Sequence, residues 1–190
     1  MKKTLLCLLI LCYTMTAPAQ SDYRSVLDEI LQRGYKESKQ NLLGVTIPSF
    51  QVTTYAGERI ISDELKGKVV VLHFWMMTCP VCMDQLNGLN QLVRQFEHNG
   101  EVEFLSFTTE TVQFLEDDFF PNYSLLFKIV PDYHQFLGTD FLVPWGFPVS
   151  MVVDRQGKIH SVFSMRDWEG EDWPVEISDK LGSSINACLE

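Results

Sequence analysis

The sequence predicts one α/β domain with a mixed central β-sheet and helices on both of its faces. Three observations favour this fold class. Residues 69–75 form an apolar run with the length of a strand that is buried on both sides. A segment of helical period follows at 86–96, and a hairpin pattern with a final amphipathic helix ends the chain. A βαβ unit followed by ββα gives a sheet with both parallel and antiparallel strands.

Before the apolar run, the sequence indicates short elements. Residues 22–40 have the apolar spacing of an amphipathic helix, which we assign to an N-terminal helical extension over 20–43. The main domain then covers 44–190. Two short strands are expected at 50–54 and 59–60, and 62–65 is expected to form a helical turn capped by Ser62 or Asp63.

After the helix at 86–96, the order of elements completes the fold. The expected elements are a strand at 102–107, helices at 111–120 and 132–137, a hairpin of 149–153 with 158–163, and a last helix from Pro174. The inner face of that last helix is expected to consist of Val175, Ile177, Leu181 and Ile185.

The composition fits a folded domain and excludes some partners. The chain has 190 residues, of which 46% are hydrophobic and 12% aromatic, enough to bury a proper core. Its formal net charge of −10 argues against DNA, other nucleic acid and anionic membrane surfaces as partners.

Residues 1–19 have the organisation of a secretory signal peptide. Two lysines precede an apolar stretch at 4–13 that is too short to span a bilayer, and Ala-Pro-Ala at 17–19 is a small-x-small cleavage site. We expect cleavage after Ala19 rather than lipid attachment at Cys12, because a leucine precedes that cysteine. The predicted location is therefore exported, periplasmic or extracytoplasmic, with membrane tethering if the signal is not cleaved.

The apolar run leads directly into Cys79-Pro80-Val81-Cys82, at the point where the next helix must begin. A dithiol between a strand and a helix N-terminus is typical of a redox site. The helix dipole and the free N–H groups of the first turn favour a thiolate at Cys79. Pro80 fits the first helical position, where its missing N–H has no partner to lose. Cys82 lies one turn inside the helix, so we expect Cys79 to attack and Cys82 to resolve.

Two other functions are compatible with the same cysteines. Met76, Met77 and Met83 add soft ligands to the dithiol, so a Cu(I)-binding protein or metallochaperone is the alternative hypothesis. Zinc is less favoured, because no second Cys-x-x-Cys or histidine pair completes four ligands. A purely structural disulfide is also less favoured, since closing so short a loop gains little stability.

Four motifs carry a resemblance to a known family. They are Ile-Pro-Ser-Phe at 47–50, Leu-Lys-Gly-Lys with the apolar run at 65–75, the Cys-x-x-Cys at 79–82, and Gly-Phe-Pro at 146–148 before the hairpin. In this order and spacing, over roughly 44–165, the chain resembles the exported thioredoxin-like thiol–disulfide oxidoreductases of the TlpA and ResA group, related to the alkyl hydroperoxide reductase and thioredoxin superfamily.

The resemblance implies a thioredoxin-like fold and a role for each matched residue. Cys79 matches the attacking cysteine, Cys82 the resolving one, and Pro148 a cis-proline that faces the dithiol. Phe147, Pro148 and Trp75 are then expected to bind substrate, with an extended segment pairing beside the proline. The expected partners are exported proteins with disulfides and a membrane or periplasmic thiol electron donor, and no cofactor is expected beyond the redox-active disulfide.

The sequence also departs from that family. Thr78 replaces a usual tryptophan before the first cysteine, and Gln85 stands where many members have an acidic residue. His73 occupies the place of a buried acid in thioredoxin, so it acts either as a general base for Cys82 or as a core histidine that supports the site. Cys188 is expected to be a small apolar residue or a free thiol.

Overall fold

The structure is a computed structural model that describes residues 22–33, 39–133, 143–167 and 173–190. The predicted signal peptide at 1–19 lies outside these residues, as does most of the helix expected at 132–137. None of the described helices is both long enough and apolar enough to cross a membrane.

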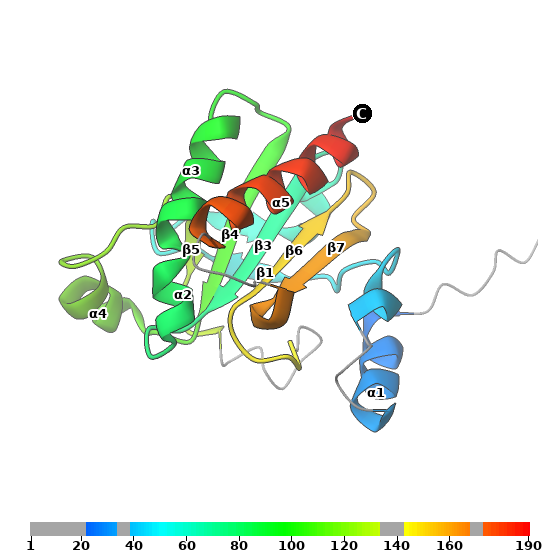
Figure 1. Cartoon of the computed structure of the whole chain (residues 1–190), viewed down its shortest axis with the longest axis horizontal. Coiled ribbons are helices and arrows are strands. Elements are labelled where there is room, and N and C mark those ends of the chain that lie inside the picture. The colour runs from blue at the N-terminus through cyan, green and yellow to red at the C-terminus, as the bar shows by residue number, and fades with distance from the viewer. Residues whose placement is uncertain (1–21, 34–38, 134–142, 168–172) are drawn as a thin grey trace, which may run out of the picture.

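The centre of the fold is a mixed five-stranded sheet of order β5-β4-β3-β6-β7 (Figure 1). Its strands are β3 (Val69–Trp75), β4 (Val102–Thr108), β5 (Lys128–Val130), β6 (Val149–Val153) and β7 (Ile159–Ser164). The neighbours β3, β4 and β5 are parallel, whereas β6 is antiparallel to both β3 and β7. The predicted mixed sheet is confirmed, with β5 as a strand that the sequence did not indicate.

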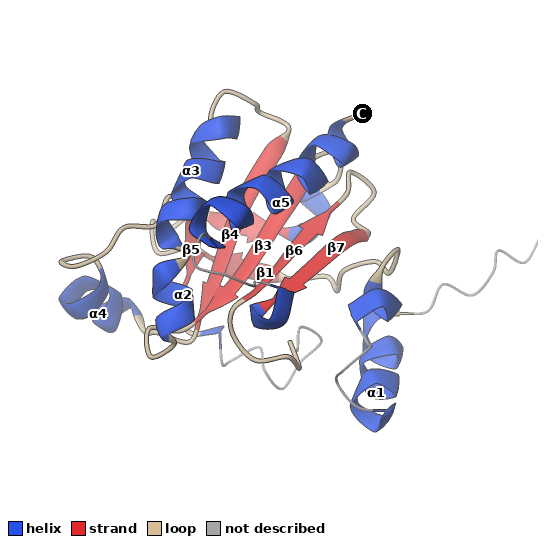
Figure 2. Cartoon of the chain, in the orientation of Figure 1, coloured by secondary structure: helices blue, strands red, loops and turns tan. Residues whose placement is uncertain are grey.

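Helices α3 and α5 lie across one face of this sheet, and β1 lies on the opposite face (Figures 1 and 2). The described α-helices are α1 (Tyr23–Arg33), α2 (Pro80–Asp84), α3 (Leu86–Phe96), α4 (Val112–Phe114) and α5 (Trp173–Leu189). Helix α4 continues into a π-helical turn, η3 (Leu115–Phe119). The other short helical turns are η1 (Lys39–Leu42), η2 (Ser62–Leu65) and η5 (Met165–Asp167). Strands β1 (Gln51–Thr53) and β2 (Arg59–Ile61) form a separate antiparallel ribbon.

Strand β3 divides the core into two layers because its side chains alternate between the two faces of the sheet. Leu72 and Phe74 belong to the cluster that also contains Leu27 of α1. Val71 and Trp75 belong to the cluster on the side of α3 and α5. All seven residues of β3 are buried, as the apolar run predicts. The inner face of α5 is confirmed at Ile177, Leu181 and Ile185, which are fully buried.

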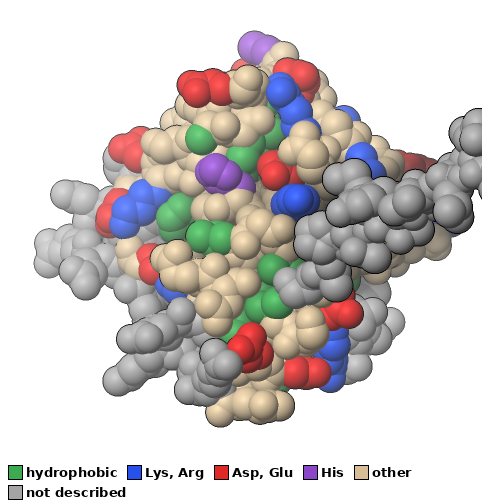
Figure 3. Space-filling view, turned by 90° about the vertical axis from the view of Figure 1, so that its right-hand side faces the viewer, with side chains coloured by type: hydrophobic (Ala, Val, Ile, Leu, Met, Phe, Trp, Pro, Cys, Tyr) green, Lys and Arg blue, Asp and Glu red, His purple; other side chains and the backbone are tan. Residues whose placement is uncertain are grey.

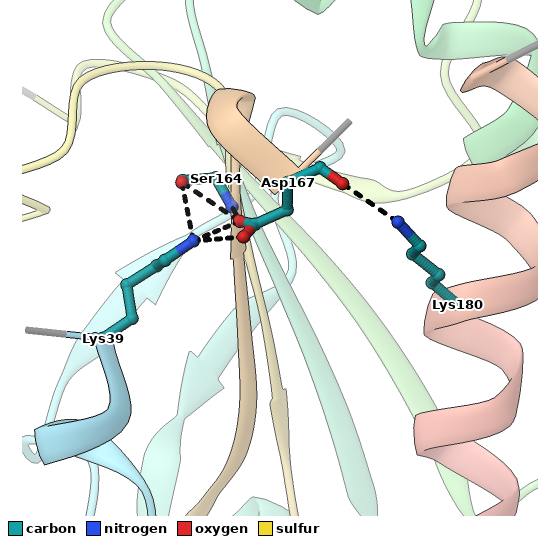
Figure 4. A network of polar contacts seen from close by, with 4 residues as sticks. All are labelled: Lys39, Ser164, Asp167 and Lys180. Carbon is teal, nitrogen blue, oxygen red and sulfur yellow. Dashed lines mark hydrogen bonds and ion pairs between the residues drawn. The ribbon is translucent and has the colours of Figure 1, made fainter. Parts of the chain in front are cut away.

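A polar network joins the N-terminal extension to the end of β7 (Figure 4). The ammonium of Lys39 pairs with the carboxylate of Asp167 and bonds to the hydroxyl of Ser164. Asp167 in turn accepts from the Ser164 amide, and its main-chain carbonyl accepts from Lys180 at 2.9 Å. Partial burial acts to raise the pKa of Asp167, but the bonds from Lys39 and Ser164 outweigh it and hold that pKa below its usual value.

The cap predicted for residues 62–65 is wrong. The turn exists as η2, but neither Ser62 nor Asp63 caps it, because Ile61 occupies the cap position and no side chain bonds there. The hydroxyl of Ser62 instead accepts the main-chain N–H of Phe50 at 2.9 Å. A contact between segments distant in sequence thus uses the group that the local pattern assigned to the cap.

Candidate active site

Cys79 and Cys82 lie at the junction of β3 and α2 and are joined by a disulfide, with their Cα atoms 5.3 Å apart. Cys79 is the N-cap of α2 in extended backbone conformation, and Pro80 follows at the first helical position. The main-chain N–H of Cys82 donates to the Cys79 sulfur at 3.2 Å. A helix N-terminus and a main-chain donor therefore both act on Cys79, which favours negative charge on its sulfur.

The two cysteines differ in exposure. Cys82 is fully buried within the core on the α3 side, whereas Cys79 is only partly buried. The carbonyl oxygen of Phe147 lies 3.7 Å from the Cys79 sulfur, and the Phe147–Pro148 peptide bond is cis. Residues 147–148, which lead into β6, are thus brought beside the accessible cysteine from 68 positions further along the chain.

Trp75 lies beneath the site rather than on its surface. Its side chain is fully buried, and its indole N–H donates to the hydroxyl of Ser106 at 2.8 Å. Its ring packs against Phe119 with centroids 4.8 Å apart. A direct substrate contact, as predicted for Trp75, conflicts with this burial, because the core around β3 takes up the whole side chain. Trp75 is instead part of the core at the end of β3.

His73 is fully buried, and its Nδ1 is hydrogen-bonded to the Ser150 hydroxyl at 2.9 Å. Burial lowers the pKa of His73 to about 3, so the imidazole is neutral in the folded protein at ordinary pH. A general base works best with a pKa near the operating pH, and His73 is far below it. The geometry therefore favours the core-histidine interpretation, with His73 between Ser106 and Ser150 of the neighbouring strands.

Two further side chains lie near the dithiol in the chain or contact the loop before it, Gln85 and Glu110. Gln85 joins α2 to α3 and is fully buried, with no partner for its amide among the described residues. Glu110 follows β4 and accepts the main-chain N–H of Met77 at 2.8 Å, two positions before Cys79. The sequence singled out Gln85 as the position, three residues after Cys82, where many family members have an acidic residue, but nothing in the sequence predicted its burial or the role of Glu110.

The other sulfur-containing side chains near the dithiol or in the last helix are soft donors of the kind that bind Cu(I). Met77 and Met83 are partly buried against the cluster that contains Cys82. Cys188 is a free thiol near the end of α5, and its pKa is raised, chiefly by burial. Among the described residues, no group of three His, Cys, Asp or Glu side chains is placed to hold a metal ion.

A cavity of about 460 Å³ lies elsewhere, beside β7 between η1 and α5, and Lys39, His160, Phe163 and Lys180 are among its lining residues. On the face of the molecule shown in Figure 3, hydrophobic side chains are exposed in a few small clusters between charged side chains. None of the residues predicted for the redox site lines this cavity.

Comparison with known proteins gives a consistent result. Residues 43–162 match the AhpC/TSA family. The thiol–disulfide oxidoreductase ResA of Bacillus thuringiensis is 30% identical over 131 residues, which covers 68% of this chain and 74% of that protein.

Solved structures extend the comparison to the fold. A secreted disulfide oxidoreductase of Mycobacterium tuberculosis superposes with a TM-score of 0.57 at 23% identity, over 73% of this chain and 95% of that one. StoA of Bacillus subtilis superposes with a TM-score of 0.54 at 23% identity, over 70% and 95%. The fold is thus thioredoxin-like.

Proposed function

Because this chain belongs to the AhpC/TSA family and is a thiol–disulfide oxidoreductase of ResA type, we propose that it reduces disulfides of exported proteins through Cys79 and Cys82. The observation that carries the proposal is the asymmetry of the dithiol. Cys79 is accessible and receives the Cys82 N–H, whereas Cys82 is fully buried in the core. One sulfur can meet a substrate and the other can meet only Cys79.

In the first step, the Cys79 thiolate attacks one sulfur of the substrate disulfide. The substrate S–S bond breaks, the leaving sulfur departs as a thiolate and takes a proton from water, and a mixed disulfide with Cys79 forms. The Cys82 thiol then gives up its proton and attacks the Cys79 sulfur. The second substrate sulfur leaves and receives a proton, so the substrate gains two electrons and the Cys79–Cys82 disulfide forms.

The dithiol must then be reduced again, which requires an external thiol donor. Disulfides persist in exported compartments, so a membrane or periplasmic donor suits a reductant there. Export itself rests on the signal-like residues 1–19 and on the likeness to a secreted oxidoreductase.

Docking is proposed at residues 147–148. The Phe147 carbonyl beside Cys79 is an acceptor for the main chain of an extended substrate segment, in the manner of strand addition. Pro148 lacks an N–H, so this main-chain position offers the acceptor without a competing donor. His73, Trp75 and Pro80 act as supports that fix the helix start and the loop before it.

Trapping of mixed disulfides tests this function. Cys82→Ser should accumulate covalent complexes with disulfide-containing exported proteins, because nothing then releases the substrate from Cys79. Cys79→Ser should accumulate few, and Cys188→Ser, the matched control, should behave like the wild type. Non-reducing gels and mass spectrometry measure the complexes. Equal trapping by the Cys79 and Cys82 variants, or none by either, would contradict the assignment.

A further inference from the structure

The connection from β4 to β5, together with Tyr55 from the turn between β1 and β2, carries an exposed aromatic surface. Tyr55, Phe120 and Tyr123 are each more than a third exposed, although their side chains are large and hydrophobic. Their rings form one contiguous set around the buried Phe119. The centroid distances are 4.7 Å for Tyr55–Phe120, 5.4 Å for Phe119–Phe120 and 5.7 Å for Phe119–Tyr123. We call these four residues the aromatic patch.

The turn that leads into this patch is acidic. Glu116, Asp117 and Asp118 of η3 are consecutive and exposed. None of the three forms an ion pair with a lysine or arginine of the described chain, although Asp117 accepts from the Gln113 amide. The carboxylates therefore present their charge to solvent beside exposed rings, in a chain whose net charge is already −10.

The patch is linked through the core to the strand that leads into the dithiol. Phe119, at the centre of the patch, packs on Trp75 at the end of β3. Glu110, two positions before α4, bonds to the main chain of Met77. Because consecutive Cα atoms are about 3.8 Å apart, Met77 and Cys79 are separated by no more than about 7.6 Å. Helix α4 and its π turn are therefore tied to the segment that leads into α2 by the Glu110–Met77 hydrogen bond and by the packing of Phe119 on Trp75.

We propose that the aromatic patch and the carboxylates of Glu116, Asp117 and Asp118 bind a Lys- or Arg-rich segment next to the reactive disulfide of a protein substrate. This inference rests on the proposed function and specifies its substrate class. Cationic side chains are attracted to aromatic faces and to unpaired carboxylates, so one basic segment satisfies both features. An anionic membrane, a nucleic acid or a second copy of this acidic chain would be repelled by the same charges.

Binding tests the surface independently of catalysis. Two fluorescein-labelled peptides each contain the same internal disulfide. In one peptide lysines and arginines flank the disulfide, and in the other glutamates do. Anisotropy with the oxidised protein should give a Kd about tenfold lower for the basic peptide, and the difference should shrink with salt. The variant E116Q/D117N/D118N should lose about tenfold in affinity for the basic peptide. The control E64Q/D179N/E190Q removes three exposed carboxylates elsewhere and should stay within about twofold.

The contribution of the aromatic rings is tested by a second pair of double variants, one in the patch and one elsewhere. Y55S/Y123S should weaken the basic peptide several-fold, and L43S/M165S, which also removes two exposed hydrophobic side chains, should not. Equal affinity for the two peptides would overturn the inference, as would equal losses in the acidic variant and its charge control. Reduction of a small neutral disulfide should be unchanged in all four variants. If that reduction is absent from the wild type, the proposed function fails, while the peptide affinities still decide the surface.

Discussion

His73→Asn should remove a specific acid sensitivity from the fold. His73 is neutral and buried when the protein is folded, with a pKa of about 3, but takes up a proton at its ordinary pKa of 6.5 when the chain unfolds. Between these values the unfolded state binds more protons, so stability rises with pH and is lost as the pH falls below 6.5. From pH 7 to pH 5 the loss from this residue is about 2 kcal/mol.

Denaturant unfolding of the oxidised wild type and His73→Asn at pH 7 and pH 5 measures this contribution. The variant loses the imidazole and its bond to Ser150, which lowers its stability equally at both pH values and cancels in the difference. The exposed His98 and His160 are present in both proteins and cancel as well. The wild type should therefore lose about 2 kcal/mol more than the variant between pH 7 and pH 5. Equal losses would refute the assignment of a neutral, buried His73.

The same variant separates a supporting role from a catalytic one. A histidine that stays neutral leaves the rate of mixed-disulfide resolution by Cys82 nearly unchanged, within about twofold at pH 7. Stopped-flow measurement of that step checks this. A slowing of tenfold or more, with the rate recovering as the pH rises, would make His73 the base for Cys82.

Three further outcomes are expected. The intact mass of the exported protein should correspond to a chain that starts after Ala19, and a chain that starts at a lipidated Cys12 would contradict this. Lys39→Met should lower the unfolding free energy by about 1 kcal/mol, less at high salt, because the Asp167 carboxylate keeps only its bonds to Ser164. Gln85→Leu should raise the melting temperature, by the equivalent of about 1–2 kcal/mol, since it removes a buried amide that has no partner in the described chain; a lower melting temperature would show that the amide is satisfied.

The elements that the sequence predicted well are those whose local pattern determines their environment. The run from Val69 to Trp75 is apolar throughout, and a strand of that kind is stable only when covered on both faces. The spacing of Ile177, Leu181 and Ile185 likewise leaves one face of α5 to bury. The position of Cys79 at the start of a helix was likewise predicted from local patterns, the apolar strand before it and the helical spacing after it.

The features that were missed depend on contacts between distant segments. Strand β5 has only three residues, and it exists because it pairs with β4 and because Lys128 forms ion pairs with Glu58 and Glu103. The bond from Met77 to Glu110 joins positions 33 apart, so no pattern within either segment announces it. The burial of Gln85 conflicts with its polarity, and residue type alone argued for a surface position.

Several of the local irregularities of this fold lie on the side of the dithiol. The amide of Gln85 and Nε2 of His73 are buried without a partner among the described residues, as are Nε of Arg155 and the hydroxyl of Ser161 at the β6–β7 hairpin. Asp132, a non-glycine residue in the left-handed region, bonds to the carbonyl of Glu110, and the π turn η3 brings Phe119 under Trp75. Buried polar groups without partners and π turns are unfavourable for stability alone, and they recur at functional sites. An irregular segment thus packs under the strand end that leads to Cys79, whereas α5 covers its face of the sheet with a regular apolar spacing.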